Sequence, residues 1–333
     1  MCGILGYVSD DTELSFEECL FMLKSLEYRG YDSWGLSYKK NNNINLIKEV
    51  GKIPLFENKD KSNLFLGHTR WATHGGVTKE NAHPHLSMNG RVTLIHNGII
   101  ENYEDIKNKL VGYNYKGQTD SEILSNYLEK NLNNENTLNS FYGILNELKG
   151  TYAISFILEN QNKLFFARKD SPLVLGISDK GNFLSSDITS FFNKTKNVVY
   201  LEDGDYGFIS GTNFEIYNSG KKVHRETKII DWDIEKASKG DFEHFMLKEI
   251  SEQAEVVKNI VNQDMSNIEN IIAKIKNKKI YIVACGTSYN AGLASSYEFL
   301  KNNKLVTVVQ AHEFKKYHKF IDKETVILAI SQS

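Results

Sequence analysis

The spacing of apolar residues changes near residue 221, and this change constrains the fold more than any other feature of the sequence. Before it, short apolar runs such as residues 152–158 and 206–209 are separated by turns rich in glycine and aspartate. Such runs are typical of antiparallel sheets whose helices form a separate layer. After it, strand and helix patterns alternate, as in residues 279–284 and 289–300, which indicates a parallel sheet. The sequence therefore predicts two domains of different class.

The domain boundaries follow from the same pattern. Residues 2–220 are predicted to form an α+β sandwich of antiparallel sheets and helices, and residues 221–269 a linker with connecting helices. Residues 270–333 are predicted to begin an α/β domain. The last strand pattern, at 325–330, would leave a parallel sheet with an uncovered edge and half of its helices missing. We therefore expect the second domain to be truncated.

Local signals place elements within the first domain. Ser15 and Glu18 form a capping box, which predicts a helix over the apolar face that follows. The polar run 39–43 is interpreted as a surface loop. The remaining patterns predict helices at 103–110, 121–128 and 137–148 and strands at 3–8, 64–67, 92–95, 152–158, 164–167, 173–177, 183–185, 198–201, 206–209 and 214–217.

The composition is that of a soluble globular protein, with 41% hydrophobic and 25% charged residues among 333. Forty basic and 42 acidic side chains give a net charge of −2 without a basic block, so we expect no nucleic-acid partner. No apolar run approaches the roughly 18 residues needed to span a bilayer, and no leader is recognised, so we expect a cytoplasmic protein without membrane association. Cys2, Cys19 and Cys285 have neither the number nor the spacing of a disulfide framework.

Cys2 would carry a thiol and a free α-amine on one residue once Met1 is removed. The amine, with an ordinary pKa of about 7.7–8.0, can take the thiol proton at neutral pH. N-terminal-nucleophile enzymes use this arrangement. The alternatives are an ordinary buried cysteine or an exposed thiol. We do not expect a lipid-modified cysteine, because that route needs a basic and apolar signal segment before it.

Three polar clusters at predicted strand or helix ends could assist a nucleophile that attacks an amide. Arg70, within residues 68–75, has a planar fork suited to a carboxylate, with a surface ion pair as the alternative. The Asn97 amide and the Gly98 backbone N–H could donate to a developing oxyanion, although Asn-Gly is more often a turn. Asp120 could bind an ammonium group or cap a helix.

The nine histidines invite a metal interpretation, above all His83 and His85. Their spacing matches no helix-borne pair or zinc finger, so packing or hydrogen bonding is the better interpretation. We expect no metal and no cofactor.

A second group of candidate residues lies in the second domain. Thr287 and Ser288 follow a strand pattern and open a helix, where backbone N–H groups and hydroxyls would suit a phosphate; a plain helix cap is the alternative. Residues 331–333 repeat the arrangement after a neighbouring strand. An α/β domain binds its ligand at such a sheet edge.

Taken together, these segments resemble the glutamine–fructose-6-phosphate aminotransferases (isomerizing), also called glucosamine-6-phosphate synthases. The likeness extends over essentially the whole chain. The matching segments are residues 2–4, 26–33, 68–75, 81–85, 96–102, 203–205, 248–250 and 284–290.

The resemblance implies an N-terminal-nucleophile domain with αββα layers, followed by a sugar-isomerase (SIS) domain. It implies that Cys2 attacks the side-chain amide of glutamine, releases ammonia and leaves a glutamyl thioester that water hydrolyses. Arg70 is then implied to bind the α-carboxylate and Asp120 the α-amine of glutamine. Asn97 and Gly98 would bind the oxyanion.

The resemblance also implies how the two domains cooperate. Trp71, Thr73 and His74 match positions that line the glutamine pocket, and Trp71 would gate a path that leads ammonia to fructose-6-phosphate, giving glucosamine-6-phosphate. A homo-oligomer through the isomerase domain is implied as well. The positions that match the sugar-phosphate site are Thr287, Ser288, Ser331, Gln332 and Ser333.

The chain departs from the family at Trp34, where a small residue is usual, and at Ala254, where proline is common. Neither position touches the proposed chemistry. The acid, base and lysine positions of sugar isomerisation are missing from the sequence, so we expect glutaminase chemistry only. A phosphoribosyl-pyrophosphate or asparagine type of amidotransferase is disfavoured by residues 285–288. A binding module without turnover stays an alternative if Met1 is retained.

Overall fold

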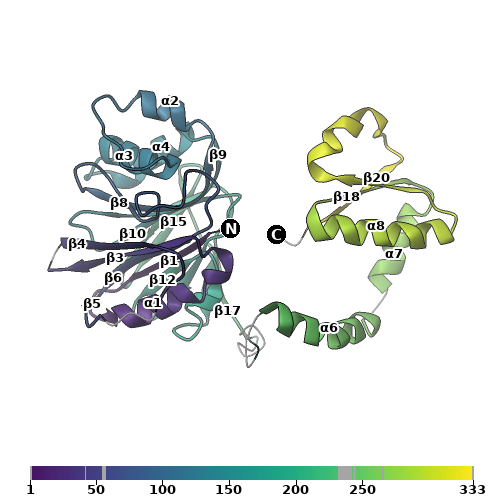
Figure 1. Ribbon diagram of the computed structural model, residues 1–333, viewed down its shortest axis with the longest axis horizontal. Helices are drawn as coiled ribbons and strands as arrows, with labels where there is room; N and C mark the ends of the chain where they lie inside the picture. Colours follow the sequence, from purple (N-terminus) through teal and green to yellow (C-terminus); the bar gives the residue numbers. More distant parts are fainter. Residues whose placement is uncertain are drawn as a thin grey trace. The chain divides into compact units, whose positions relative to one another are not determined.

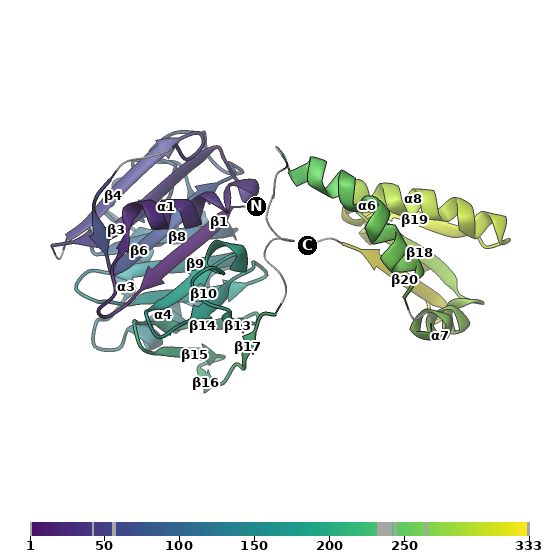
Figure 2. The ribbon, with the colours of Figure 1, turned by 90° about the horizontal axis from the view of Figure 1, so that it is seen from below.

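The computed structural model describes residues 2–41, 43–54, 58–231, 242, 245–263 and 266–331. The chain divides into two compact units, residues 1–238 and residues 239–333 (Figures 1 and 2). We call them the first unit and the second unit and describe each by itself.

Two antiparallel sheets form the centre of the first unit. The eight-stranded sheet has the order β17-β13-β11-β12-β1-β6-β3-β4, and the seven-stranded sheet has the order β16-β15-β14-β10-β9-β8-β7. A separate short ladder pairs β2 with β5. The strands are β1 (Gly3–Val8), β2 (Leu14–Ser15), β3 (Ser33–Lys40), β4 (Asn43–Val50), β5 (Lys61–Ser62), β6 (Leu64–Arg70), β7 (His85–Leu86), β8 (Val92–Ile100), β9 (Gly150–Leu158), β10 (Leu164–Lys169), β11 (Val174–Ile177), β12 (Asn182–Ser185), β13 (Asn197–Tyr200), β14 (Asp205–Ile209), β15 (Phe214–Asn218), β16 (Lys221–Val223) and β17 (Thr227–Ile229).

Helices cover the outer faces of the two sheets. Figure 1 shows α2, α3 and α4 together on one side of the first unit and α1 on the opposite side. One apolar cluster lies between the sheets, with Ile4 and Phe166 among its members, and two more lie beneath the helices. This layered arrangement confirms the predicted α+β sandwich. The helical segments are α1 (Phe16–Lys24), η1 (Glu27–Arg29), α2 (Tyr103–Asn108), α3 (Asp120–Asn131), α4 (Thr137–Glu147) and η2 (Ile188–Ser190).

The start of α1 confirms the capping box. The Ser15 hydroxyl accepts the Glu18 backbone N–H, and the Glu18 carboxylate accepts the Ser15 backbone N–H at 2.9 Å. The reciprocal bonds satisfy two backbone donors that a helix start leaves unpaired. Phe16 and Leu23 on this helix are fully buried, which stabilises the layer by about 1.5–3 kcal/mol for each side chain.

A hairpin that the sequence pattern did not predict lies at the edge of the eight-stranded sheet. β3 and β4 pair from Ser33 with Val50 to Lys40 with Asn43, so most of the polar run 39–43 extends the strands. β6 pairs with the preceding part of β3, from Ser33 to Tyr38, and so anchors the hairpin to the sheet, whereas residues 39, 40 and 43 pair only within the hairpin.

The first unit also continues past the predicted boundary at residue 220. β16 pairs with β15 in one sheet, and β17 pairs with β13 in the other. Their lysine-rich sequences gave the appearance of a linker, but both are edge strands, where charged residues are common. The polar run 231–241, also assigned to the linker, lies outside the described residues except for residue 231.

The second unit contains a parallel sheet, as predicted, with the order β19-β18-β20. No helix in the described part of the chain is both long and apolar enough to cross a membrane. The elements are α6 (Phe245–Val261), α7 (Ser266–Ile275), β18 (Lys279–Ala284), α8 (Gly286–Lys301), β19 (Val306–Gln310), η3 (Ala311–Phe320) and β20 (Thr325–Ile330).

Candidate active site

Cys2 is held at the start of β1, a strand in the interior of the eight-stranded sheet. Its backbone carbonyl accepts hydrogen bonds from Arg29 Nε at 3.0 Å and from Asn97 Nδ2 at 2.8 Å. Its Sγ atom accepts the Trp71 backbone N–H at 3.2 Å. Three segments that are far apart in the sequence therefore hold both the backbone carbonyl and the sulfur atom of Cys2 in place.

The segment around Trp71 is positioned by a close backbone approach. A Cβ atom on Gly30 would lie 2.6 Å from the backbone N of Trp71, so only glycine fits there. Asp32 continues the contact: its carboxylate accepts the Ala72 N–H at 2.8 Å. The polar turn after α1 thus aligns the N–H group that contacts the Cys2 sulfur.

A cavity of about 330 Å³ opens in front of Cys2. All eight residues predicted for catalysis and glutamine binding line it: Cys2, Arg70, Trp71, Thr73, His74, Asn97, Gly98 and Asp120. The size suits a small polar molecule. The fold therefore brings these eight side chains and backbone groups to one place.

Asn97 and Gly98 lie within the last four residues of β8, where the strand pairs with β9. Gly98 has a φ of +119°, and a Cβ atom there would lie 2.1 Å from the carbonyl oxygen of Thr151. Only glycine tolerates both the backbone conformation and the contact. Asn-Gly is here part of a paired strand, so the alternative of a simple turn does not apply.

Asp120 begins α3 and is buried, with Thr119 as the helix cap. Its carboxylate accepts the Ile100 backbone N–H at 2.8 Å. A negative charge is stabilised at a helix N-terminus. The alternative that Asp120 is only the cap is excluded, because the Thr119 hydroxyl accepts the Glu122 N–H in that role.

Arg70 ends β6 and is 4% exposed, so it is not part of a surface ion pair. Its guanidinium donates to backbone carbonyls of the following loop: Nη1 to Gly76 at 3.0 Å, and Nη2 to Gly75 at 3.4 Å and to His74. The guanidinium therefore orders the loop that carries Thr73 and His74.

Burial raises the pKa of the Cys2 thiol, although the Trp71 N–H bond and the positive charges of Arg70 and Arg29 act in the opposite direction. A thiol with a raised pKa is protonated at neutral pH. A nucleophilic role therefore requires a base that removes its proton.

Four buried histidines pack beside the cavity: His68, His83, His85 and His96. Burial lowers the pKa of each, that of His68 to about 3, so these rings are neutral at physiological pH. The rings of His68 and His83 stack with centroids 4.2 Å apart. Among the described residues, no group of three or more histidine, cysteine or acidic side chains is arranged to hold a metal ion.

Other residues that line the cavity had no predicted role in catalysis or glutamine binding. Arg29 belongs to a motif that was given no role, and Thr151 follows no local signal. Residues 170–172 directly follow β10, and strand ends had already drawn attention to Arg70 and Asn97, so the same rule would have found them. The remaining lining residues are His83, His96, Ile99, Thr119 and Ser121.

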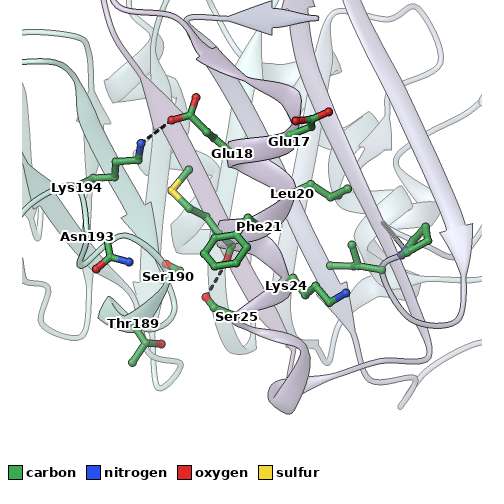
Figure 3. A pocket seen from close by; sticks show the side chains of 13 residues that line it. Glu17, Glu18, Leu20, Phe21, Lys24, Ser25, Thr189, Ser190, Asn193 and Lys194 are labelled. Atoms are coloured by element: carbon green, nitrogen blue, oxygen red, sulfur yellow. Dashed lines mark hydrogen bonds and ion pairs between the residues drawn. The ribbon is translucent and has the colours of Figure 1, made fainter. Parts of the chain in front are cut away.

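A larger cavity, of about 860 Å³, lies elsewhere in the first unit, between α1 and the segment that follows η2 (Figure 3). Glu18 and Lys194 on its walls pair with each other at 2.7 Å. The Ser25 hydroxyl donates to the Met22 carbonyl at 2.7 Å. These polar groups are engaged with neighbouring protein groups, so we take the smaller cavity at Cys2 as the candidate active site.

In the second unit, Thr287 and Ser288 lie in the first turn of α8, directly after β18. β18 and β20 end in register, with Ala284 opposite Ile330, so Ser331 follows at the same edge of the sheet. Gln332 and Ser333 lie outside the described residues. The described candidates for the sugar-phosphate site therefore share one sheet edge.

Comparisons with known proteins find matches for both units of the chain. A family model described as a glutamine amidotransferase domain matches residues 55–228, and an SIS domain model matches residues 274–333. The whole chain is 37% identical to glutamine–fructose-6-phosphate aminotransferases (isomerizing) from Sulfolobus acidocaldarius and Clostridium acetobutylicum. It spans 59% and 57% of the lengths of these two relatives.

Two solved structures share the fold. A structure described as the allosteric regulatory enzyme of purine biosynthesis has a TM-score of 0.54 and 26% identity, and the match covers 65% of this chain and 49% of that chain. A glutamine phosphoribosylpyrophosphate amidotransferase from B. subtilis has a TM-score of 0.53 and 18% identity, and covers 93% of this chain and 65% of its own.

Proposed function

Because this chain belongs to the glutamine amidotransferase family, we propose that Cys2 cleaves the side-chain amide of glutamine to give glutamate and ammonia. The observation that carries the proposal is the single cavity in which Cys2, Arg70, Asn97 and Asp120 meet. A sulfur nucleophile, a cation, an amide donor and an anion are the four groups that a zwitterionic amide substrate requires.

The reaction begins with proton transfer from the Cys2 thiol to its own α-amine, directly or through a water molecule. The amine is basic only after Met1 has been removed, because a preceding peptide bond would convert it to an amide. The thiolate then bonds to the amide carbon of glutamine, and the carbonyl oxygen becomes an oxyanion. Collapse of this intermediate breaks the C–N bond, and the nitrogen leaves as ammonia with the proton that the amine held.

Asn97 and Gly98 stabilise the oxyanion. The Asn97 amide group has two N–H donors, and one of them is used by the Cys2 carbonyl. The second is available for the oxyanion, together with the Gly98 backbone N–H. Water then attacks the glutamyl thioester with the amine as base, which releases glutamate and restores the thiol.

Arg70 and Asp120 bind the two charges of the glutamine backbone. The guanidinium has five N–H donors, and the carbonyls of residues 74–76 account for three contacts, which leaves donors for a carboxylate. Asp120 receives the ammonium group. Trp71, Thr73 and His74 complete the wall of the pocket.

For the longer protein to which its relatives correspond, we propose that the ammonia is transferred to fructose-6-phosphate to form glucosamine-6-phosphate. Thr287 and Ser288, with residues 331–333, hold the sugar phosphate in this proposal. The identity with the two aminotransferases over the whole chain supports this assignment. A cytoplasmic homo-oligomer that assembles through the isomerase domain completes the proposal.

Glutamate release from glutamine by the purified chain tests the proposed function. We expect turnover in the wild type and a loss of at least about a thousandfold in Cys2→Ala, because the covalent route is removed. Cys285→Ala is the matched control, since Cys285 is an exposed cysteine in the second unit, and it should retain full glutaminase activity. Turnover that persists in Cys2→Ala would contradict the proposal.

A further inference from the structure

His68 lies beside Asn97 but does not line the cavity at Cys2. It belongs to β6, its side chain is fully buried, and its Nε2 atom is 2.8 Å from Asn97 Oδ1. We propose that His68 is a positioning residue, whose neutral imidazole donates from Nε2 and thereby fixes the orientation of the Asn97 amide. The inference rests on the proposed glutaminase function for its effect on rate, although its hydrogen-bond assignment does not.

The chemistry of the neighbouring groups determines the direction of this hydrogen bond. The Cys2 carbonyl oxygen can only accept, so the side of the Asn97 amide that faces it at 2.8 Å must be the NH₂ group. The amide oxygen of Asn97 then faces His68. Because that oxygen can only accept, the Nε2 atom of His68 must carry a hydrogen.

The surroundings of His68 keep this donor in place. Burial is the main cause that lowers the pKa of His68 to about 3, so the ring is neutral over the pH range in which enzymes work. A neutral imidazole has one N–H, and the Asn97 oxygen selects the Nε2 tautomer. The ring of His83 stacks on it at 4.2 Å and 15°, which prevents rotation of the imidazole.

This arrangement has a consequence for the reaction. If the amide of Asn97 turned by 180°, its oxygen would face the Cys2 carbonyl, and an acceptor would replace the donor that the oxyanion needs. The oxyanion exists only after the attack on glutamine, so a misoriented Asn97 affects the transition state more than substrate binding. A change at His68 should therefore lower kcat and leave KM for glutamine nearly constant.

Two substitutions at His68 introduce the same polar NH₂ donor at different distances from the backbone. They therefore test whether the donor must lie at the position of Nε2. In His68→Gln the side-chain NH₂ reaches about as far as Nε2, so kcat should stay within about fivefold of the wild type. In His68→Asn the NH₂ group lies nearer the backbone and cannot reach Asn97, so kcat should fall about 10–100-fold, part of the loss seen when an oxyanion donor is deleted. KM should change less than about threefold in both variants.

The decisive kinetic comparison uses Asn97→Ala as a second background. If His68 acts through Asn97, then His68→Asn should cause almost no further loss of kcat once Asn97 has been replaced. A purely structural role of His68 would instead reduce kcat by the same factor in both backgrounds. That result, or a large rise in KM with kcat unchanged, would overturn the inference.

An NMR measurement tests the hydrogen bond without any turnover. In the intact chain with ¹⁵N-labelled histidine, we expect His68 to be in the Nε2–H tautomer and to stay uncharged down to about pH 5. An Nδ1–H tautomer would overturn the inference even if the chain is an active glutaminase. If this tautomer is found but the wild type lacks glutaminase activity, the proposed function fails and the assigned role of His68 in orienting Asn97 stands.

Discussion

The two units of this chain differ in how completely they bury their apolar side chains. In the first unit, three clusters enclose the apolar faces of both sheets and of the helices that cover them. In the second unit, large apolar side chains are exposed on several helices: Val257 on α6 is 59% exposed, Ile271 on α7 52%, and Leu300 on α8 50%. Apolar side chains are therefore less completely buried on the helices of the second unit than in the clusters of the first.

The two candidate sites also differ, in how completely the structure defines the contacts of their residues. The cavity proposed to bind glutamine is lined by strands and a helix end of the first unit, with defined contacts of Cys2, Arg70, Asn97 and Asp120. The sugar-phosphate candidates lie at one edge of a three-stranded sheet. The proposal for the first site is supported by this geometry as well as by likeness to relatives, whereas the proposal for the second depends mainly on likeness. The substitutions below test this contrast.

The largest effect on stability is expected from Gly98→Ala. The new methyl group would meet the Thr151 carbonyl at 2.1 Å and would adopt a φ of +119°. We expect a loss of about 3 kcal/mol or more in the free energy of unfolding, measured by urea denaturation, together with loss of glutaminase activity.

Gly112→Ala is the matched control for this substitution. Gly112 also has a positive φ, of +85°, but no atom lies within 4 Å of the added Cβ. We expect Gly112→Ala to lower the free energy of unfolding by about 1 kcal/mol, because it has the cost of the positive φ without a steric clash. Equal losses in the two variants would show that β8 and β9 are not packed as tightly as we describe.

An intermediate effect is expected from Arg225→Met. The Asp205 carboxylate is fully buried and accepts two hydrogen bonds from Arg225, at 2.9 and 2.8 Å. Removing one partner of a buried pair costs about 3–5 kcal/mol, but we expect only about 2 kcal/mol because Arg225 is partly exposed and Asp205 keeps its bonds from Asn218 and the Glu202 N–H. Lys316→Met removes an exposed ion pair with Glu313 in the second unit and should cause no measurable loss.

The Arg225 effect should depend on pH. Burial alone would raise the pKa of Asp205, but the bonds from Arg225 and Asn218 outweigh it and hold the pKa below its ordinary value. The stabilisation is therefore complete above the pKa of an unfolded aspartate, about 3.9, and is lost as the pH falls through the lower folded value. The stability difference between wild type and Arg225→Met should shrink on acidification, and a difference that grows would contradict the buried pair.

Apart from the control Lys316→Met, the smallest effect is expected from Val257→Asn in the second unit. Because this side chain is 59% exposed, its replacement should change the free energy of unfolding of the chain by no more than about 0.5 kcal/mol. It should also reduce self-association in sedimentation experiments. A loss comparable to that of Arg225→Met would mean that α6 is packed more closely than its exposure indicates.

The sequence predicts those features that depend on local patterns. The capping box at Ser15 and the strand patterns from residue 150 onward each show their signal within a few residues. Arg70 and Asn97 were found by the same kind of argument, as polar residues after the predicted strands 64–67 and 92–95, although both lie inside strands that are longer than predicted. The fold class of each unit can be predicted from these local signals.

Features that depend on distant neighbours could not be predicted in this way. The hairpin of β3 and β4 is ordered by β6, and the contact of Arg29 with the Cys2 carbonyl joins residues 27 positions apart. The bond between His68 and Asn97 requires two strands from different sheets to face each other. No periodicity in one segment encodes such contacts.

Covalent labelling of the chain with a glutamine analogue that carries a diazoketone in place of the amide tests the central claim most directly. Peptide mass spectrometry should find the analogue bound to a peptide that begins at Cys2 without Met1, and an excess of glutamine should prevent the labelling. Labelling of Cys19 or Cys285 instead, or of a peptide that still carries Met1, would contradict the claim that the N-terminal cysteine is the nucleophile.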